Sequence, residues 1–410
     1  MSTLTVYLDS HLARMVHHTQ RLAQKRWRLP ALQPVVCAVD YLARAAFHVW
    51  RNRQYLTIMK LANMALVNVQ FRMKTERVVG RPYRMKIEST NICNTKCQLC
   101  PTGLGYAGRA KGKMSLEQYR QLIEQLKGTL YSLDLSMWGD PLIVPEIFDM
   151  IRYAHDRRIW TYISSNLHAL KLDPEKRQAE RLVESGLDVL TCSLHGASQE
   201  TFAIYQPGKS LADAVAKVRH IVETRNRMGS ATPKVQLNFV VTRYNEHEVE
   251  AFQQLADDLG CKAVISWAAL NVRFLNRDQH TGQPLNLAPD VLAKKARTHI
   301  ERWLPESQQH KLAVYDAIQK GEYQPGDFNG RKLYDCSWPW LASVINWDGT
   351  VVTCCGSWDQ EEDMGSVLDQ RFGRVWNGKK YRMARRSFKK RVNEAEAKDN
   401  PCATCPGYMI

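Results

Sequence analysis

The sequence predicts an α/β fold: a partial (β/α)6 TIM-like barrel, with a helical N-terminal extension and a small cysteine-rich α+β domain at the C-terminus. Three observations predict it. Strand-like and helix-like stretches alternate between residues 84 and 267, which is typical of parallel strands with helices packed outside them. Cysteines gather in one short loop at residues 93–100 and again between positions 336 and 405. Residues 1–80 are strongly basic and read as helices.

Length and composition limit the number of domains, the kind of partner and the cellular location that the chain can have. A chain of 410 residues can form two domains, and its net charge of +16 indicates an anionic partner such as a membrane surface, a phosphorylated substrate, nucleic acid or an acidic redox protein. The eleven cysteines are mostly grouped at ligand-like spacings, which favours a reducing, cytoplasmic setting. Asp9, His11 and Arg14 interrupt any apolar signal core, and no run of about 18 apolar residues is present, so neither a secretory signal nor a membrane span is expected.

Residues 1–80 carry more than half of the net charge. Lys and Arg number 12 there against three Asp and Glu, which gives 12 − 3 = +9. The stretch reads as consecutive helices, the last of them over residues 58–69. Trp27, Trp50 and Tyr55 stand close to basic residues, as in an interfacial helix that lies on anionic lipid. The alternative, weighed equally, is a helical cap packed on the catalytic domain.

The central region supplies the elements of the barrel. Strands are expected at residues 85–89, 133–137, 160–164, 189–193, 234–242 and 263–267, and helices at residues 116–126, 146–155, 175–185, 211–227 and 246–259. The carboxyl ends of such strands carry the chemistry in barrels of this kind. The expected domains are an N-terminal extension (1–80), the barrel (81–270), a helical linker (271–330) and a cysteine-rich domain (331–410) that begins with a short hairpin turning at Asp348-Gly349.

Cys93, Cys97 and Cys100 form a C-x3-C-x2-C loop directly after the first strand. A [4Fe–4S] cluster normally takes four thiolates, so three from one loop leave one iron for a ligand that is not protein. A zinc knuckle or a buried structural thiol cluster is the alternative. The spacing resembles the radical S-adenosylmethionine (radical SAM) superfamily. In that superfamily the open iron binds the amino and carboxylate groups of S-adenosyl-L-methionine (AdoMet).

Further motifs follow the order in which this family arranges its AdoMet site. The segment Trp138-Gly139-Asp140-Pro141 resembles the Gly-Gly-Glu-Pro-like turn whose backbone receives the AdoMet amino group, with Asp140 in place of the usual Glu. After the third strand, Ser164-Ser165-Asn166 stands where the family has a Thr-Asn-Gly turn. The resemblance implies that Ser164 and Asn166 contact AdoMet.

Later strands complete the expected AdoMet site. Ser193 begins a segment that resembles the family's Ser-Leu-Asp-Gly-Ala sequence, whose serine helps to hold AdoMet, and His195 departs from that sequence. Gln206 stands where relatives often carry an arginine that pairs with the AdoMet carboxylate, so this contact is weakened or passes to another residue. Gln236 or Asn238, both expected to face inward on the fifth strand, is assigned to the ribose.

The C-terminal cysteines indicate a second metal site. Their spacing around Gly349 resembles the abbreviated SPASM, or twitch, domain of radical SAM enzymes with one auxiliary cluster. The expected ligands are Cys336, Cys354, Cys402 and Cys405. Cys355 makes the assignment ambiguous, and the spacing from Gly349 favours Cys354. Four thiolates would ligate a [4Fe–4S] cluster fully, which suits electron transfer, and a structural zinc site is the alternative.

The resemblance implies an enzyme with AdoMet and two [4Fe–4S] clusters. A flavodoxin- or ferredoxin-type donor reduces the first cluster, AdoMet is cleaved, and a 5′-deoxyadenosyl radical removes a substrate hydrogen atom. The favoured reaction is oxidation of a carbinol carbon in a carbohydrate-like or lipid-linked small molecule, with the auxiliary cluster as electron acceptor. The location favoured is the cytoplasm, with or without peripheral contact to the cytoplasmic face of the membrane.

Three alternatives stay open. An epimerase would need a hydrogen donor, and Cys355 is the candidate because Cys37, Cys192 and Cys261 are expected to lie elsewhere. A peptide-modifying maturase would act on a small precursor encoded nearby. A nucleic-acid-binding protein with structural clusters would explain the positive charge, but not an open three-cysteine site, so nucleic acid is not favoured.

Overall fold

The computed structural model describes residues 52–106, 108–268, 273–281, 283–310, 336–357, 359–389 and 400–403. The chain divides into two compact units, residues 1–61 and 62–410, and the first is described from residue 52 onward. The expected last helix of the basic region is present as α3 (Ile58–Arg72). Trp27, Trp50 and Cys37 lie outside the described residues. Over the part that is described, no helix has both the length and the apolar content needed to cross a membrane.

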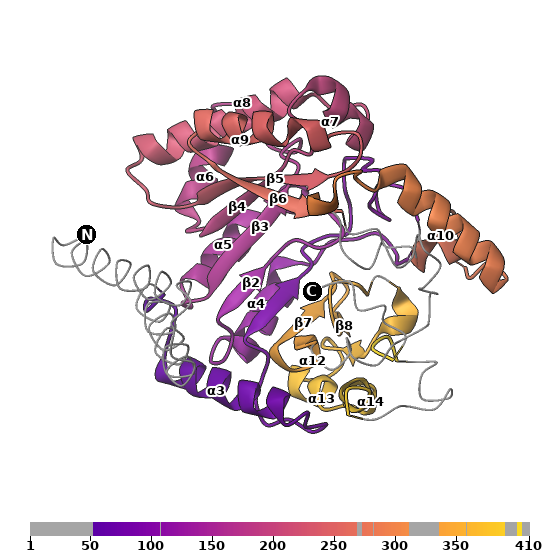
Figure 1. The fold of residues 1–410 in the computed structure, drawn as a ribbon. Coiled ribbons are helices and arrows are strands. Elements are labelled where there is room, and N and C mark those ends of the chain that lie inside the picture. Colours follow the sequence, from indigo (N-terminus) through magenta and orange to yellow (C-terminus); the bar gives the residue numbers. More distant parts are fainter. Residues whose placement is uncertain are drawn as a thin grey trace, which may run out of the picture. The chain divides into compact units, whose positions relative to one another are not determined.

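One sheet organises the second unit. Over the described residues it has nine strands in the order β6-β5-β4-β3-β2-β1-β7-β8-β9, and β1 to β6 are all parallel. The barrel strands are β1 (Arg84–Ile87), β2 (Ser132–Asp134), β3 (Trp160–Ser165), β4 (Val189–Ser193), β5 (Lys234–Val241) and β6 (Lys262–Trp267). The α/β fold and the partial barrel predicted from the sequence are therefore confirmed (Figure 1).

Helices cover the outer face of this sheet (Figure 1). They are α4 (Leu116–Leu126), α5 (Ile147–His155), α6 (Gln178–Glu184), α7 (Gln199–Tyr205), α8 (Leu211–Arg227) and α9 (Val249–Asp258), with short 3-10 turns η2 (Pro141–Ile143) and η3 (Glu246–Glu248). Along β3 and β5 every second residue is fully buried beneath the helices, for example Ile163, Leu237 and Phe239. The residues between them are half-buried and face the barrel lumen, as the period-two pattern of a strand requires.

Local sequence explains the helix boundaries. Ser115 and Gln118 form a reciprocal capping box at the start of α4, whose observed bounds match those expected from periodicity. The short helix α7 is absent from the sequence-based expectation. It begins after Ser198, whose hydroxyl caps the N–H of Thr201. After the barrel come η4 (Arg273–Asn276), α10 (Pro289–Trp303) and η5 (Gln308–His310).

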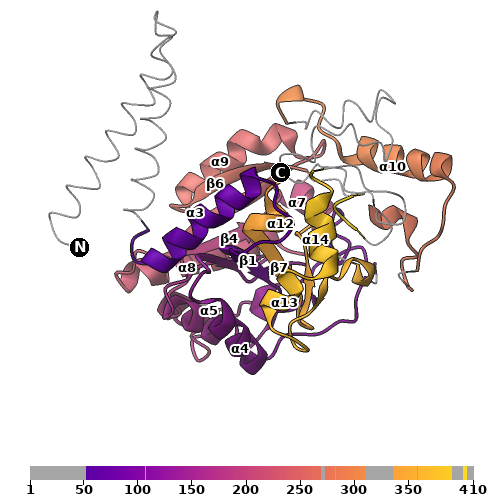
Figure 2. The same ribbon diagram turned by 90° about the horizontal axis from the view of Figure 1, so that it is seen from below.

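The C-terminal domain extends the barrel sheet. The hairpin strand β7 (Ala342–Ile345) pairs in parallel with β1, in the register Arg84↔Ala342 to Ile87↔Ile345, and β8 (Thr350–Val352) and β9 (Gly365–Ser366) continue the sheet. The hairpin turns at Gly349, whose φ of +80° and close approach to Leu368 leave no room for a side chain. Figure 2 shows α12 (Trp338–Leu341), α13 (Phe372–Trp376) and α14 (Lys379–Arg386) grouped beside β7.

Candidate active site

The loop after β1 brings two of its three thiols to one hydroxyl. The Thr95 Oγ1 atom lies 3.1 Å from the Cys93 Sγ and 3.4 Å from the Cys97 Sγ. The Cys100 N–H donates to the Cys97 carbonyl at 3.2 Å, which folds the loop back on itself. The three cysteines predicted as ligands of the first cluster therefore lie in one short loop, where the Thr95 hydroxyl lies between Cys93 and Cys97 and Cys100 interacts electrostatically with both.

The chemistry of these thiols fits a cationic cluster. Burial raises the pKa of Cys97 to about 12, and the neighbouring Cys100 and Cys93 add to the effect. Burial also raises the pKa values of Cys93 and Cys100. Three neighbouring, half-buried thiols do not all become thiolates readily unless positive charge compensates them, and bound iron supplies it because coordination deprotonates the thiol. The donor set is therefore suited to a [4Fe–4S] cluster with one iron open.

The turn after β2 packs directly on the segment that leads into the cysteine loop. A Cβ atom on Gly139 would lie 2.3 Å from the Thr90 carbonyl oxygen and 2.6 Å from that of Ile92, so only glycine fits. The Asp140 N–H donates to the Ile92 carbonyl at 3.0 Å. The Asp140 carboxylate accepts hydrogen bonds from the Ser165 hydroxyl and from the backbone N–H groups of Asn166 and Leu142. Asp140 thus joins the turn to the end of β3.

Polar side chains at the ends of β3 and β4 meet above the lumen. The Ser164 and Ser193 hydroxyls lie 3.3 Å apart. The Asn166 amide donates to Asn94 Oδ1 at 3.0 Å and approaches the Cys93 sulfur at 3.7 Å. The structure therefore brings the residues predicted for AdoMet into the same region as the three thiols.

Gln206 supplies a buried acceptor in this region. Its side-chain N–H donates to the Ser193 carbonyl at 3.1 Å, while its Oε1 atom is buried and has no hydrogen-bond partner among the described residues. An unpaired buried acceptor is costly, and a ligand donor such as an ammonium or hydroxyl group would satisfy it. His195 is different: its Nδ1 accepts the Val240 N–H, and burial lowers its pKa to about 3, so it is neutral and structural.

The inward residues of β5 pair with neighbouring strands. The Gln236 amide donates to the Thr191 hydroxyl at 2.7 Å, and the Asn238 side-chain oxygen accepts the Ser266 hydroxyl at 2.7 Å. Both side chains therefore lie on the lumen side, where the predicted contact with ribose requires them. Their specific contact stays a prediction.

The barrel lumen contains an ion pair that the sequence did not predict. Lys86 on β1 and Asp134 on β2 are register partners, and their side chains form a salt bridge of 2.5 Å. Burial is the largest single effect and lowers the pKa of Lys86, but the combined effects of Asp134, Cys355 and Tyr162 raise the pKa overall. Tyr162 and Cys355 are further electrostatic neighbours of Lys86. No motif in the sequence marks this pair, because it depends on the register of β1 against β2 in the folded chain.

The auxiliary cysteines lie in the C-terminal domain. Cys354 and Cys402 both interact electrostatically with the buried Tyr381. Burial is the main cause that raises the pKa of Tyr381, and these two sulfur atoms raise it further. Cys402 is buried and Cys336 is half-buried against the same core. Cys405 lies outside the described residues. Three of the four predicted ligands are therefore described, and the full ligand set stays a prediction.

Arg109 connects the segment after the cysteine loop to the C-terminal hairpin. Its guanidinium donates to the Asp363 carboxylate, to the Thr350 hydroxyl at 2.9 Å and to the Asp359 carbonyl at 2.9 Å. The side chain is only 3% exposed, and Asp348 lies 3.7 Å away. No motif in the sequence marked this residue, because all of these partners lie far along the chain, in the C-terminal domain.

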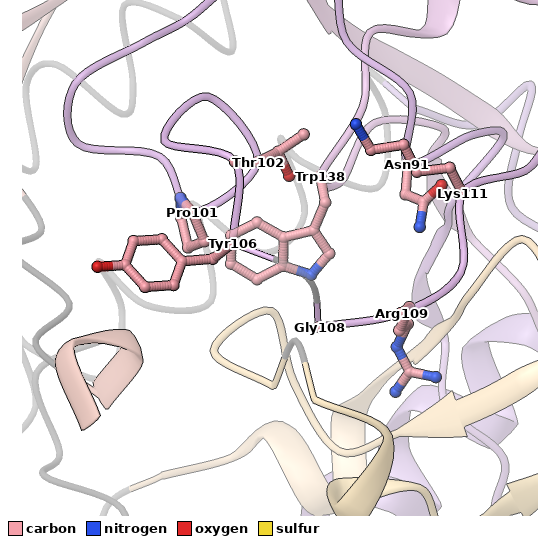
Figure 3. Close-up of a pocket in the computed structure, with 9 residues that line it drawn as sticks. Asn91, Pro101, Thr102, Tyr106, Gly108, Arg109, Lys111 and Trp138 are labelled. Atoms are coloured by element: carbon pink, nitrogen blue, oxygen red, sulfur yellow. The ribbon is translucent and has the colours of Figure 1, made fainter. Parts of the chain in front are cut away.

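A pocket of about 140 Å³ opens between these elements (Figure 3). Its lining includes Thr102 and Tyr106 beyond the cysteine loop, Trp138 of the β2 turn, and Arg109. Figure 3 shows the Trp138 indole nitrogen on the side of Arg109. Within the described residues, neither the Trp138 Nε1 nor the Arg109 Nε has an acceptor, although both are buried. Both residues line the pocket, so each carries a candidate donor for a ligand bound there.

Comparison with known families identifies this arrangement. Residues 87–256 match the radical SAM superfamily, and residues 336–406 match the SPASM iron–sulfur cluster-binding domain. The chain belongs to the radical SAM superfamily and carries a C-terminal SPASM domain. As a radical SAM enzyme with a SPASM domain it uses AdoMet and more than one [4Fe–4S] cluster.

Several curated proteins resemble this radical SAM enzyme over its barrel. Mycofactocin maturase MftC of Mycobacterium ulcerans is 27% identical over 185 residues, covering 45% of this chain and 47% of that protein. The AdoMet-dependent heme synthase of Methanosarcina barkeri is 24% identical over 186 residues, covering 45% of this chain and 50% of that protein. The chain thus spans about half the length of these curated relatives.

Solved structures share the fold. Streptococcus suis SuiB bound to its precursor peptide SuiA has a TM-score of 0.54 and 13% identity, covering 84% of this chain and 74% of that one. SuiB bound to S-adenosylmethionine has a TM-score of 0.53 and 13% identity, covering 96% of this chain and 81% of that one. At this level of identity the likeness concerns the fold alone.

Proposed function

We propose that this enzyme is a peptide-modifying radical SAM maturase, the alternative that the sequence left open beside small-molecule oxidation. The supporting observation is the edge strand β6. Among the described residues it pairs only with β5, and it ends in Trp267, which is 54% exposed. Its residues Ala263 to Ser266 are uncharged and contain no proline. An edge of this kind can accept an extended peptide as an added strand.

The relatives support the same proposal. One curated relative is named a maturase, and SuiB, which shares the fold, was solved with a precursor peptide. A peptide strand along β6 would run beside the open side of the partial barrel, so one of its side chains could enter the lumen. The pocket at Trp138 and Arg109 would hold another group of the substrate by its acceptor atoms.

The lumen has the groups that such a reaction needs. AdoMet, when bound and reduced, supplies a radical that takes a hydrogen atom from the substrate. Lys86 and Asp134 would orient the polar part of the substrate, and their ion pair provides both a donor and an acceptor. Ser164, Ser193 and Gln206 would hold AdoMet, while the buried strand ends exclude water. Cys336, Cys354, Cys402 and Cys405 would hold the auxiliary cluster, which supplies an electron acceptor for a net oxidation.

Small-molecule oxidation is the second candidate. The lumen carries hydroxyl and amide pairs, Gln236 with Thr191 and Asn238 with Ser266, that suit a polyhydroxylated substrate. Epimerisation would instead need a hydrogen donor, and Cys355 lies next to Lys86 for that role. A flavodoxin- or ferredoxin-type protein is the proposed electron donor in each case.

The test uses the anaerobically reconstituted enzyme with AdoMet, a reductant and synthetic peptides that correspond to any short open reading frames beside its gene. We expect 5′-deoxyadenosine formation to depend on the peptide, and mass spectrometry to show a peptide that has lost two hydrogen atoms. Deuterium uptake from deuterated water without that loss would indicate epimerisation. Unchanged peptide, together with oxidation of a polyol in the same preparation, would overturn the maturase proposal.

A further inference from the structure

Glu88 lies where the barrel, the β2 turn and the C-terminal hairpin meet. It follows β1 directly and is fully buried. One carboxylate oxygen accepts the Trp138 backbone N–H at 3.1 Å, and the other accepts the Trp347 backbone N–H at 3.3 Å. The Glu88 N–H also donates to the Ile345 carbonyl at 2.8 Å. A single side chain therefore bonds two turns that are far apart in the sequence.

The two partners belong to different halves of the catalytic machinery. Trp138 begins the turn assigned above to the AdoMet amino group, and Gly139 in that turn has no space for even a methyl group against Thr90. Trp347 begins the hairpin turn that leads through β8 to Cys354. Its indole N–H donates to the Ala110 carbonyl at 3.1 Å, so the hairpin turn is itself fixed to the barrel.

The surroundings of Glu88 leave its charge finely balanced. Burial raises its pKa to about 7, although both N–H bonds and Arg109 favour the charged form and Asp348 opposes it. The Arg109 guanidinium also donates to the Asp363 carboxylate, and this pairing limits how far its positive charge stabilises ionised Glu88. The ionised carboxylate accepts both N–H groups strongly, whereas the hydroxyl oxygen of the protonated acid is a weaker acceptor and carries a proton of its own.

We propose that Glu88 is a positioning residue that couples the AdoMet-binding turn to the hairpin of the SPASM domain. Ionised Glu88 holds both turns, so it stabilises the AdoMet-binding geometry and passes the effect of AdoMet binding to the hairpin. Protonation of Glu88 weakens one of the two bonds. Because coupling is reciprocal, AdoMet binding must in turn favour the ionised form. This inference rests on the assignment of Trp138 to Pro141 to AdoMet, and not on the choice of substrate.

The first test measures the dissociation constant of AdoMet on the reconstituted holoenzyme. The wild type should bind about fivefold to tenfold more tightly at about pH 8.5 than at about pH 6, the scale of one ordinary net hydrogen bond. Glu88→Gln should bind with the weaker affinity at both pH values, since its amide has one acceptor. AdoMet itself titrates in the same way with both proteins. The readout is therefore the difference in pH dependence of the dissociation constant between the wild type and Glu88→Gln.

Asp188→Asn is the matched control. Asp188 is also a buried carboxylate that accepts a backbone N–H, that of Thr161 at 2.8 Å, but it lies at the opposite end of the strands. This variant should keep the wild-type affinities and their pH dependence. A wild-type pH dependence in Glu88→Gln, or equal wild-type affinities at the two pH values, would overturn the proposal.

The second test needs no variant. In hydrogen exchange of the wild-type holoenzyme above pH 8, AdoMet should slow exchange in residues 137–141 and also in residues 346–349. Slowing in the first segment alone would show that AdoMet binds there without coupling to the hairpin, which contradicts the proposal. No slowing in either segment would contradict the assignment of the turn to AdoMet. Neither result depends on whether a peptide is the substrate.

Discussion

Cys354 and Cys355 are neighbours in the chain but face different groups. Cys354, like Cys402, interacts electrostatically with Tyr381 in the interior of the C-terminal domain. Burial raises the pKa of Cys355, and Lys86 in the barrel lumen lowers it in part. The residue that follows a predicted iron ligand is thus directed toward the substrate side, which agrees with using Cys354 as the ligand and reserving Cys355 for the substrate.

Iron content tests this division. Cys355→Ala should retain about eight irons per chain after anaerobic reconstitution, by the four-iron arithmetic of two clusters, whereas Cys354→Ala should retain about four. The reason is that Cys354 shares the neighbour Tyr381 with Cys402, whereas Cys355 has Lys86 as its neighbour. Iron and acid-labile sulfide analysis measures both. If Cys355→Ala loses four irons and Cys354→Ala does not, the two assignments must be exchanged.

Replacing Cys93, Cys97 and Cys100 together with alanine should abolish AdoMet cleavage. Without these thiolates no iron can be presented to AdoMet. The measurement is 5′-deoxyadenosine formed under dithionite. Cys261→Ala is the control, because Cys261 is buried near the start of β6, far from the carboxyl ends of the strands. Undiminished cleavage in the triple variant would refute the central site.

Elements with a local pattern were predictable, and pairings between distant segments were not. The helices α4 and α8 have the bounds expected from their apolar periodicity. The pairing of β7 with β1 joins segments from opposite ends of the catalytic region, and nothing in either short strand specifies that partner. The same holds for the site. The cysteine loop is a local motif, whereas Lys86, Glu88 and Arg109 gain their roles from contacts that only the folded chain creates.

The edge strand β6 gives a prediction for the proposed peptide. Trp267→Ala removes the largest exposed apolar side chain of that strand, and it should weaken peptide binding about tenfold or less, given the exposed half of the ring. AdoMet cleavage without peptide should stay as in the wild type. Met228→Ala removes an exposed apolar side chain at the end of α8 and serves as the control. Equal peptide affinity in both variants would place the peptide elsewhere.

At the scale of the whole chain, charge and apolar exposure gather toward the N-terminus. Residues 1–80 supply +9 of the net +16. Helix α3 also exposes apolar side chains, with Ile58 88% and Met59 64% exposed. A basic, apolar segment is attracted to anionic lipid both by its charge and by its apolar surface. The competing interpretation is a cap whose apolar surface is covered by the rest of the chain.

Vesicle flotation decides between a membrane-binding segment and a cap. The full-length enzyme should float with vesicles that contain phosphatidylserine and should not float with neutral vesicles, because each basic residue near an anionic surface contributes about 1 kcal/mol. Raising the salt from about 0.1 M to about 1 M shortens the screening length from about 10 Å to about 3 Å and should release most of the protein. Retention at high salt on anionic vesicles would indicate that apolar insertion dominates. Absence of flotation on anionic vesicles at low salt would favour the packed cap.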